Sequence, residues 1–292
     1  GSFAGVINKI QKTKLFRKSL QKIAGIEKKR ILPEYAKQPF YKWFSKNYVS
    51  KQDVDKRVVL FADTYLNFHE PNIGIAATQL LQTLGYEVIL ANVGCCQRPK
   101  ISHGFLKDAK KEGTKTAQNL DKYFQQGLTV VVCEPSCASA LTDDLPDLIE
   151  EEGLAKRLTK NVKMIDIFIQ EEIESGNIKK ELRAKAKNIF VHGHCHQKAI
   201  YGTKAMKQVL TDTNVQEIPS GCCGIAGSFG YEKEHYDVSM QIGELKLFPS
   251  VRKASSDTII AANGTSCRHQ IKDGTGRVAL HPVSILAQAI RK

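Results

Sequence analysis

The chain contains 292 residues, of which 42% are hydrophobic, and this size and composition predict a globular protein with one large domain or two modest ones. It has no run of roughly 18 or more apolar residues and no apolar stretch behind its basic N-terminus, which argues against a membrane-spanning helix and a secretory signal. We therefore expect a cytoplasmic protein. Its eight cysteines then stay reduced and indicate metal or redox chemistry rather than disulfide bonds.

The formal net charge of +13 lies mostly in residues 1–57, which hold 15 of the 43 Lys and Arg residues but only 4 of the 30 Asp and Glu residues. Apolar residues recur there at roughly helical spacing: Phe3, Val6, Ile7, Ile10, Phe16, Leu20 and Ile23. This pattern predicts a basic, amphipathic N-terminal helical extension. Such a helix suits an anionic membrane surface, nucleic acid, an acidic partner or neighbouring domain, or simply solvent. No nucleic-acid motif accompanies the charge, so we expect no nucleic-acid partner.

From residue 58 onward, apolar strands alternate with helices. The expected strands are residues 58–62, 86–90 and 128–132 in the first half of this region, and 188–191, 215–219 and 258–262 in the second. A helix opens at Pro71 and ends at Gly85, a long helix ends near Gly127, and helical segments from about Leu154 to Ser175 join the two halves. Strands that alternate with helices predict parallel sheets.

The two halves repeat one pattern of cysteines. Gly94-Cys95-Cys96 recurs 127 residues later as Gly221-Cys222-Cys223, Cys137 recurs 130 residues later as Cys267, and Thr64 lies 131 residues before Cys195. Offsets that agree so closely indicate a duplicated unit. We therefore predict an α/β fold with two pseudo-symmetric parallel-sheet repeats. Its parts are a basic helical extension (1–57), a first repeat (58–150), a helical connector (151–187) and a second repeat (188–292).

The cysteine landmarks follow the predicted strands, where parallel sheets bind ligands. Two thiolates about 4 Å apart repel by roughly 4 kcal/mol at an effective dielectric constant near 20, so converging cysteines are either neutral thiols or hold metal. Adjacent cysteines rarely bind one zinc ion together, whereas an iron-sulfur cluster offers several iron atoms to them. The doublets therefore favour a cluster over buried, unreactive thiols.

Three segments carry a family resemblance: GCCGIAGSFGYEKEHY (221–236), VHGHCHQKA (191–199) and NGTSCRHQI (263–271). They closely resemble the C-terminal iron-sulfur region of FAD-linked oxidases that act as dehydrogenases of D-2-hydroxy acids, either D-lactate or D-2-hydroxyglutarate. The wider relatives carry duplicated cysteine-rich CCG domains and are subunits of larger enzymes: the glycolate oxidase iron-sulfur subunit and subunits of anaerobic glycerol-3-phosphate dehydrogenase and heterodisulfide reductase. The resemblance runs from about residue 58 to the end of the chain.

The resemblance implies a 4Fe-4S-type cluster in the second repeat. The implied ligands are Cys195, Cys222, Cys223 and Cys267. Gly264 stands where the family pattern has a fifth cysteine, so a five-cysteine, non-cubane cluster is in doubt. His194 and His196 are expected to contact the cluster, to bind iron or to be structural, and Gly224 is expected to let a backbone amide approach a sulfur.

The first repeat keeps fewer of the family's cysteines. It retains Cys95, Cys96 and Cys137, but Thr64 and Glu134 stand at the other two positions. It could bind zinc through the three cysteines with Glu134, lend a ligand to the second repeat, or only pack. Cys133 lies outside the pattern, and we expect it to be buried.

The resemblance also implies the function. We expect an electron-transfer module, part of a longer chain or a subunit, that passes electrons from the flavin of a dehydrogenase to a quinone or protein acceptor. The sequence has no flavin motif, so FAD belongs to a separate domain or subunit, no catalytic residue is assigned, and the chain alone should be inactive. The alternatives are a cluster that reduces a disulfide substrate and a zinc-stabilised scaffold that binds a dehydrogenase subunit. The basic extension is expected to dock on the flavin partner or on the inner face of the membrane.

Overall fold

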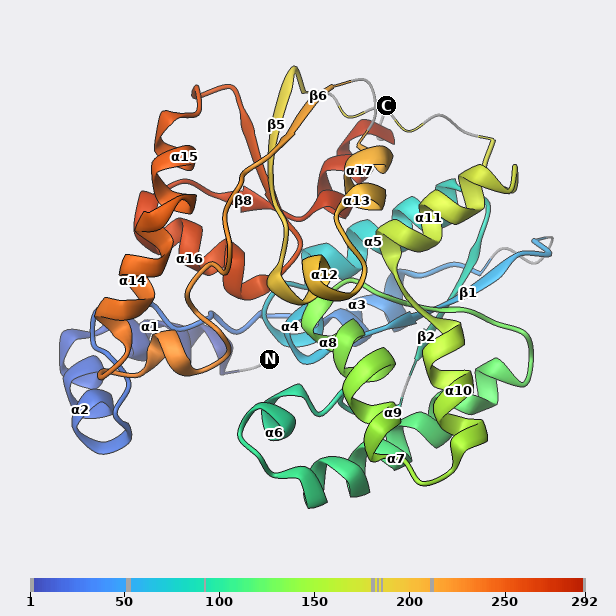
Figure 1. The fold of residues 1–292 in the computed structure, drawn as a ribbon, viewed down its shortest axis with the longest axis horizontal. Coiled ribbons are helices and arrows are strands. Elements are labelled where there is room, and N and C mark those ends of the chain that lie inside the picture. The colour runs from blue at the N-terminus through green and yellow to red at the C-terminus, as the bar shows by residue number, and fades with distance from the viewer. Residues whose placement is uncertain are drawn as a thin grey trace.

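The computed structural model describes residues 3–50, 54–91, 93–179, 182, 184, 186–210 and 213–290. Two α/β bodies lie side by side, and the helices near the N-terminus lie against the C-terminal body (Figure 1). This arrangement confirms the predicted α/β fold with two pseudo-symmetric parallel-sheet repeats and an N-terminal helical extension.

Each repeat is built on a four-stranded parallel sheet. The first sheet contains β1 (Arg57–Phe61), β2 (Glu87–Ala91), β3 (Val130–Val132) and β4 (Val162–Met164) in the order β2-β1-β3-β4. The second contains β5 (Asn188–His192), β6 (Asn214–Glu217), β7 (Ile259–Ala262) and β8 (Ala279–Leu280) in the order β6-β5-β7-β8. The central strands are continuous apolar runs because helices cover both faces of a parallel sheet.

Helices connect the strands in both repeats, and two helices follow the first strand in each. The first repeat has α4 (Thr64–Phe68), α5 (Pro71–Thr83), α6 (Arg98–Ser102), α7 (Leu106–Phe124), α8 (Pro135–Ser139), a π-helical turn (Ala140–Asp144), α9 (Leu145–Leu148), α10 (Glu152–Asn161) and α11 (Ile165–Glu174). The second has α12 (Cys195–Ile200), α13 (Lys204–Val209), a 3-10 turn (Phe229–Tyr231), α14 (Tyr236–Leu245), α15 (Leu247–Lys253), α16 (Thr265–Thr275) and α17 (Pro282–Ile290).

The stretch 151–187, which we expected to be a helical connector, also contributes a strand. β4 lies between α10 and α11 and pairs with β3 to complete the first sheet. It spans three residues and β8 spans two, so neither is long enough to show a strand pattern in the sequence.

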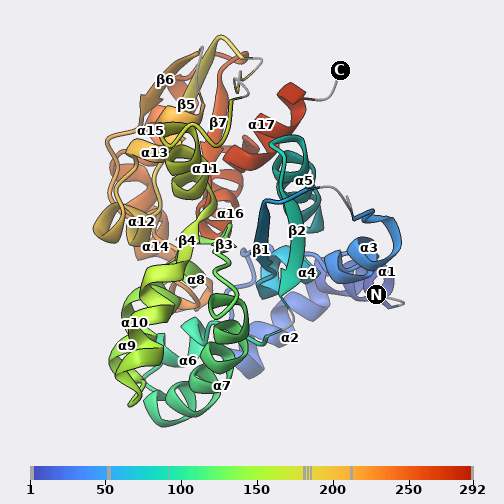
Figure 2. The same cartoon turned by 90° about the vertical axis from the view of Figure 1, so that its right-hand side faces the viewer.

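One buried hydrophobic cluster spans the two repeats, and each repeat also has a cluster of its own. The helix after the fourth strand of each repeat packs on the helix after the first strand of the other, so that α17 contacts α5 and α11 contacts α13 (Figures 1 and 2). Their side chains form a single buried cluster, which includes Leu80, Ile169, Val209 and Leu286. This reciprocal packing fixes the ligand-binding edges of the two sheets relative to each other.

The N-terminal extension contains α1 (Ala4–Lys12), α2 (Lys14–Ala24) and α3 (Phe40–Asn47). It precedes the first repeat in sequence, and α3 packs on α4 and α5 of that repeat. The segment after α2 instead contacts the second repeat, because Ile26 forms an antiparallel bridge with Glu232 and the Glu27 N–H donates to Tyr231 O at 2.7 Å. The extension therefore bridges both repeats.

Candidate metal centre

The four predicted ligands of the second repeat lie at the carboxyl ends of three neighbouring strands. Cys195 begins α12 after β5, Cys222 and Cys223 follow β6, and Cys267 lies in the first turn of α16 after β7. Because β5 pairs with both β6 and β7, the three loops meet at one edge of the sheet.

The four thiols form a connected chain. Thiol-to-thiol interactions link Cys195 to Cys222, Cys222 to Cys223, and Cys223 to Cys267. These hydrogen bonds raise the pKa of Cys195 and Cys223 and lower the pKa of Cys222 and Cys267. One end of the chain is buried at Cys223 and Cys267, and the other is partly exposed at Cys195 and Cys222.

The turn after the doublet brings a backbone amide to a sulfur. The Gly224 N–H donates to Cys222 Sγ at 3.3 Å, and Gly224 has a φ of +101°. A Cβ at this position would lie closer than 3.0 Å to the Ser239 carbonyl oxygen. In the first repeat, Gln97 has a φ of +63° and its N–H donates to Cys95 Sγ at 3.4 Å. The two doublets are therefore followed by the same turn, although only one of the two residues is glycine.

His194 is buried beside Cys195 and caps α12. Its Nδ1 accepts a hydrogen bond from the His196 N–H at 3.2 Å and lies 4.0 Å from Cys195 Sγ. Its ring also lies against Gly264, where a Cβ would come closer than 3.0 Å to the ring. Gly264, which replaces a cysteine of the family pattern, thus makes room for the His194 ring.

His196 connects the second repeat to the first. Its Nδ1 lies 2.8 Å from Ser139 Oγ, which also accepts a hydrogen bond from Arg98 Nη2 at 2.9 Å. Burial, followed by the charge of Arg98, lowers the pKa of His196 to about 4, so the ring is neutral at pH 7. Its geometry indicates a contact between the repeats.

His192 is a site residue that the sequence analysis missed. It is the last residue of β5, is fully buried, and its Nδ1 lies 2.8 Å from Ser220 Oγ. Its Nε2 has no well-formed hydrogen bond to any described residue, yet the ring is close enough to Cys267 to contribute to lowering the pKa of that thiol. The signal in the sequence was a histidine at the end of an otherwise apolar strand, next to the more conspicuous HCH triplet.

The first repeat also brings three cysteines together. Cys96 Sγ and Cys137 Sγ lie 2.9 Å apart, both buried, and the thiol of exposed Cys95 interacts with that of Cys96. Cys133 is buried, as expected. Thr64 begins α4, at the position that corresponds to Cys195 in α12.

Glu134, the fourth residue of the zinc site considered above, caps the N-terminal ends of two helices. Its Oε1 accepts hydrogen bonds from Ser136 N and Oγ at 3.4 and 2.9 Å, and its Oε2 accepts one from Thr265 N at 2.9 Å. It therefore caps α8 of its own repeat and also the start of α16, whose own N-cap residue is Gly264. Within the part of the chain that the structure describes, no three or more His, Cys, Asp or Glu side chains are arranged around a single metal ion.

Charged and polar side chains join the two ligand-binding edges. Arg268 Nη2 donates to Glu70 Oε2 at 2.5 Å and its Nε donates to Oε1 at 3.1 Å. Burial alone would raise the pKa of Glu70, but Arg268 lowers it to about 2. This ion pair joins α16 of the second repeat to the start of α5 in the first.

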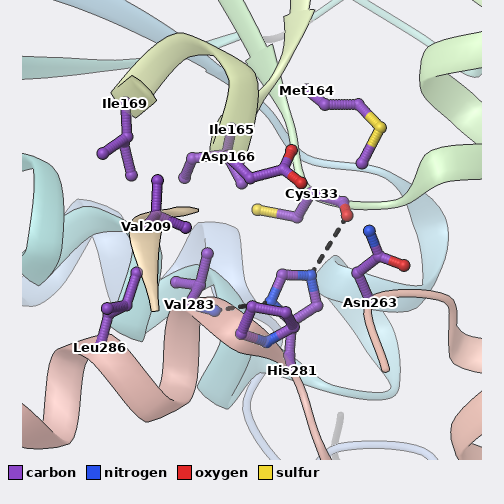
Figure 3. Close-up of a pocket in the computed structure, with 11 residues that line it drawn as sticks. Cys133, Met164, Ile165, Asp166, Ile169, Val209, Asn263, His281, Val283 and Leu286 are labelled. Atoms are coloured by element: carbon purple, nitrogen blue, oxygen red, sulfur yellow. Dashed lines mark hydrogen bonds between the residues drawn. The ribbon is translucent and has the colours of Figure 1, made fainter. Parts of the chain in front are cut away.

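A small cavity lies between the repeats, and most of the residues that line it are apolar. His281 donates from Nε2 to the Cys133 carbonyl oxygen at 3.2 Å, and Asp166 and Asn263 line the same cavity of about 10 Å³ (Figure 3). A second cavity of about 10 Å³ adjoins Asp63 and Asn263, whose Oδ2 and Oδ1 atoms are buried and make no hydrogen bond to the described residues. Each cavity has room for about one water molecule.

The family is established by comparison with known proteins. Residues 61–142 and 189–272 each match the family described as "Cysteine-rich domain", CCG. The chain therefore belongs to the CCG family and contains the domain twice, as the cysteine spacing predicted.

Known relatives include proteins that the sequence motifs resemble. The chain is 26% identical to a subunit of anaerobic glycerol-3-phosphate dehydrogenase of Escherichia coli K12, over 99% of this chain and 73% of that protein. It is 27% identical to lactate utilization protein A of Macrococcus caseolyticus, over 79% of this chain and 96% of that protein. It is 23% identical to D-2-hydroxyglutarate dehydrogenase of Pantoea ananatis, over 80% of this chain but 23% of that protein. The relatives associate the chain with oxidoreductases.

Proposed function

We propose that the chain is an electron-transfer module of a dehydrogenase and that its second repeat holds a 4Fe-4S-type cluster. The observation that carries this proposal is the connected chain of four thiols, Cys195, Cys222, Cys223 and Cys267, drawn from three strand ends to one edge of a sheet. Iron-sulfur clusters are held by sets of cysteine thiolates, and this donor set consists of four. When bound, the cluster would accept and release single electrons.

The surroundings of the thiols fit such a group. The Gly224 N–H already donates to a ligand sulfur, and hydrogen bonds to sulfur tune the potential of such clusters. His192 presents a buried ring beside Cys267. Cys223 and Cys267 are 4% and 1% exposed, so they exclude water from one side. Electrons would enter or leave on the other side, where Cys195 and Cys222 are partly exposed.

The partner in this proposal is an FAD-binding dehydrogenase domain or subunit. The relatives named above are dehydrogenase subunits, dehydrogenases or lactate utilization proteins, which supports an electron donor of this class. We propose a D-2-hydroxy acid as the substrate of that partner and a quinone or a protein as the electron acceptor. The chain itself would carry no substrate chemistry.

We also propose that the N-terminal extension contacts the inner face of a membrane. Phe3, Val6, Ile7 and Ile10 of the first helical turns are between 43% and 74% exposed, and residues 3–26 contain lysines and one arginine but no Asp or Glu. An exposed apolar stripe flanked by cations favours an anionic lipid surface. In the described ranges, no helix is long and apolar enough to cross a bilayer. Sedimentation with vesicles that contain anionic lipid, compared with neutral vesicles, tests this contact, and equal recovery in the supernatant would contradict it.

Metal and sulfide analysis of protein prepared without oxygen tests the main proposal. We expect about four iron and four sulfide per chain and absorbance near 400 nm that dithionite bleaches. Zinc without iron or sulfide would overturn the proposal and favour the scaffold alternative. A cluster that turns over a disulfide substrate without any flavoprotein would favour the disulfide-reductase alternative.

A further inference from the structure

Arg30, from the basic extension, is buried inside the second repeat. It is 1% exposed, although it lies in the loop between α2 and α3. Its guanidinium donates from Nε to Gly230 O (2.5 Å), from Nη1 to Gln270 Oε1 (2.7 Å) and Asp273 Oδ2 (3.0 Å), and from Nη2 to Ser239 Oγ (2.7 Å). These partners lie 200 to 243 residues away in sequence.

Two of these partners control the turn that carries the cysteine doublet. Gly230 closes the loop that starts at Gly224, because its N–H donates to Ile225 O at 2.8 Å. The Ser239 carbonyl oxygen lies so close to Gly224 that a Cβ would not fit between them. Arg30 thus hydrogen-bonds one end of this loop at Gly230, and it hydrogen-bonds Ser239, which packs against the other end at Gly224. The Gly224 N–H is the one that donates to Cys222 Sγ.

A third partner connects this turn to Cys267. Gln270 lies one helical turn after Cys267 on α16, and its Nε2 donates to Ser239 O at 2.9 Å while its Oε1 accepts from Arg30. The loop of Cys222 and the helix of Cys267 are therefore joined through one guanidinium. Arg30 therefore contacts residues next to two of the three strand ends that carry the candidate ligands.

The chemistry at this position requires arginine. A guanidinium donates in several fixed directions at once, whereas a lysine ammonium is a compact charge without that planar fork. The guanidinium carbon also lies 4.9 Å from the centre of the Tyr236 ring and 5.7 Å from that of Tyr231. The neighbouring backbone holds the segment in place, since the Lys233 N–H donates to Gly25 O at 2.7 Å.

We propose that Arg30 is a positioning residue of the metal centre: it sets the spacing between the Cys222–Cys223 turn and Cys267, so the N-terminal extension is part of the site. This inference rests on the proposed function, because it concerns the same cysteines. It assigns the extension a role in the electron-transfer module that is separate from docking.

The test measures thiol reactivity in the complete, reduced, metal-free chain. Iodoacetamide labelling resolved by cysteine with mass spectrometry gives the rate at Cys223 relative to the rate at Cys133, which is buried outside the site. In Arg30→Met this ratio should rise roughly tenfold, because the turn opens locally while the rest of the fold persists. Arg30→Lys should give a smaller rise and keeps the test informative if Arg30→Met does not fold. After reconstitution without oxygen, both variants should bind less iron and show an altered electron paramagnetic resonance spectrum.

Arg277→Met is the matched control. Arg277 also donates to backbone carbonyls within the second repeat, at Ala254, Ser255 and Thr258, but these precede β7 and lie away from the ligands. It should lower thermal stability without changing the labelling ratio. An unchanged ratio in folded Arg30→Lys, or an equal rise at every cysteine, would overturn the inference. A wild-type chain that binds no iron would instead overturn the proposed function and leave the labelling result interpretable.

Discussion

The two repeats have the same scaffold but different chemistry at equivalent positions. Both sheets have the same strand order, and both doublets are followed by a turn with positive φ whose amide donates to the first cysteine. Yet α12 begins with a cysteine and α4 begins with Thr64. The duplicated fold therefore supplies the geometry of a thiol site twice, and single side chains decide whether four thiols meet there.

Near the cysteines of the first repeat, Asp63 and Glu134 lie at the interface with the second repeat. Asp63 caps α4 just as His194 caps α12, but it lines the second small cavity between the repeats. Glu134 occupies the position of Gly264 and caps both α8 and α16. These two first-repeat residues are therefore part of the interface with the second repeat.

The largest expected effect separates the two doublets. Cys223→Ser should reduce bound iron more than roughly tenfold, because Cys223 is the buried link between Cys222 and Cys267 and a neutral hydroxyl is a poor ligand for iron. Cys96→Ser, the matched change in the first repeat, should leave iron content within about twofold. Iron and sulfide content of the reconstituted variants checks both. Equal losses in the two variants would show that the repeats share one metal site.

A second prediction concerns Asp63, which occupies the position in the first repeat that His194 occupies in the second, and the pH dependence of stability. Burial is the main cause that raises the pKa of Asp63 to about 7, above the value of 3.8 expected in the unfolded chain. When the pKa of a carboxyl group is higher in the folded chain than in the unfolded chain, its contribution to stability is fully present at a pH below the unfolded-state pKa. That contribution is lost as the pH rises through the folded-state pKa. The free energy of unfolding should therefore fall between about pH 4 and pH 8, by about 2–4 kcal/mol on the scale of 1.36 kcal/mol per pKa unit.

Asp63→Asn should remove most of this slope. Asparagine caps a helix about as well as aspartate, so α4 keeps its start, and the side chain no longer ionises. Denaturant unfolding of the metal-free chain at several pH values measures the difference. Parallel pH profiles for wild type and variant would contradict the prediction.

The sequence predicted much of the fold because the duplicated apolar strands and glycine turns carry local signals. β1 is apolar from Val58 to Phe61 and β5 is apolar from Ile189 to Val191, and Pro71 opens α5 as expected. The short strands β4 and β8 carry too few residues to show a pattern, and the sheet recruits them through pairing that only the tertiary structure supplies.

The sequence predicted those parts of the site that depend on the presence and spacing of cysteines. The sequence indicated which cysteines follow strands and showed His192 at the end of a strand, but the role of His192 depends on the position of its ring beside Cys267, which only the tertiary structure supplies. The role of Arg30 could not be predicted from the sequence, because Arg30 follows solvated lysines and its partners lie 200 or more residues away. Glu134 was one candidate zinc ligand because of its position, and the structure shows that a carboxylate in that place caps two helices.

The smallest effect is expected at Gly264, the position of the second repeat that corresponds to Glu134 in the first. Gly264→Ala places a methyl group against the His194 ring, which must shift, so we expect a loss of about 1–3 kcal/mol in stability and weaker iron binding. Gly221→Ala is its control, because no heavy atom of the described chain lies within 4 Å of the place where its new methyl group would stand. Denaturant unfolding and iron content of both variants provide the measurement. If Gly264→Ala has the same stability and iron content as Gly221→Ala, the His194 ring is free to move. Glycine at position 264 would then not be needed for a histidine at position 194.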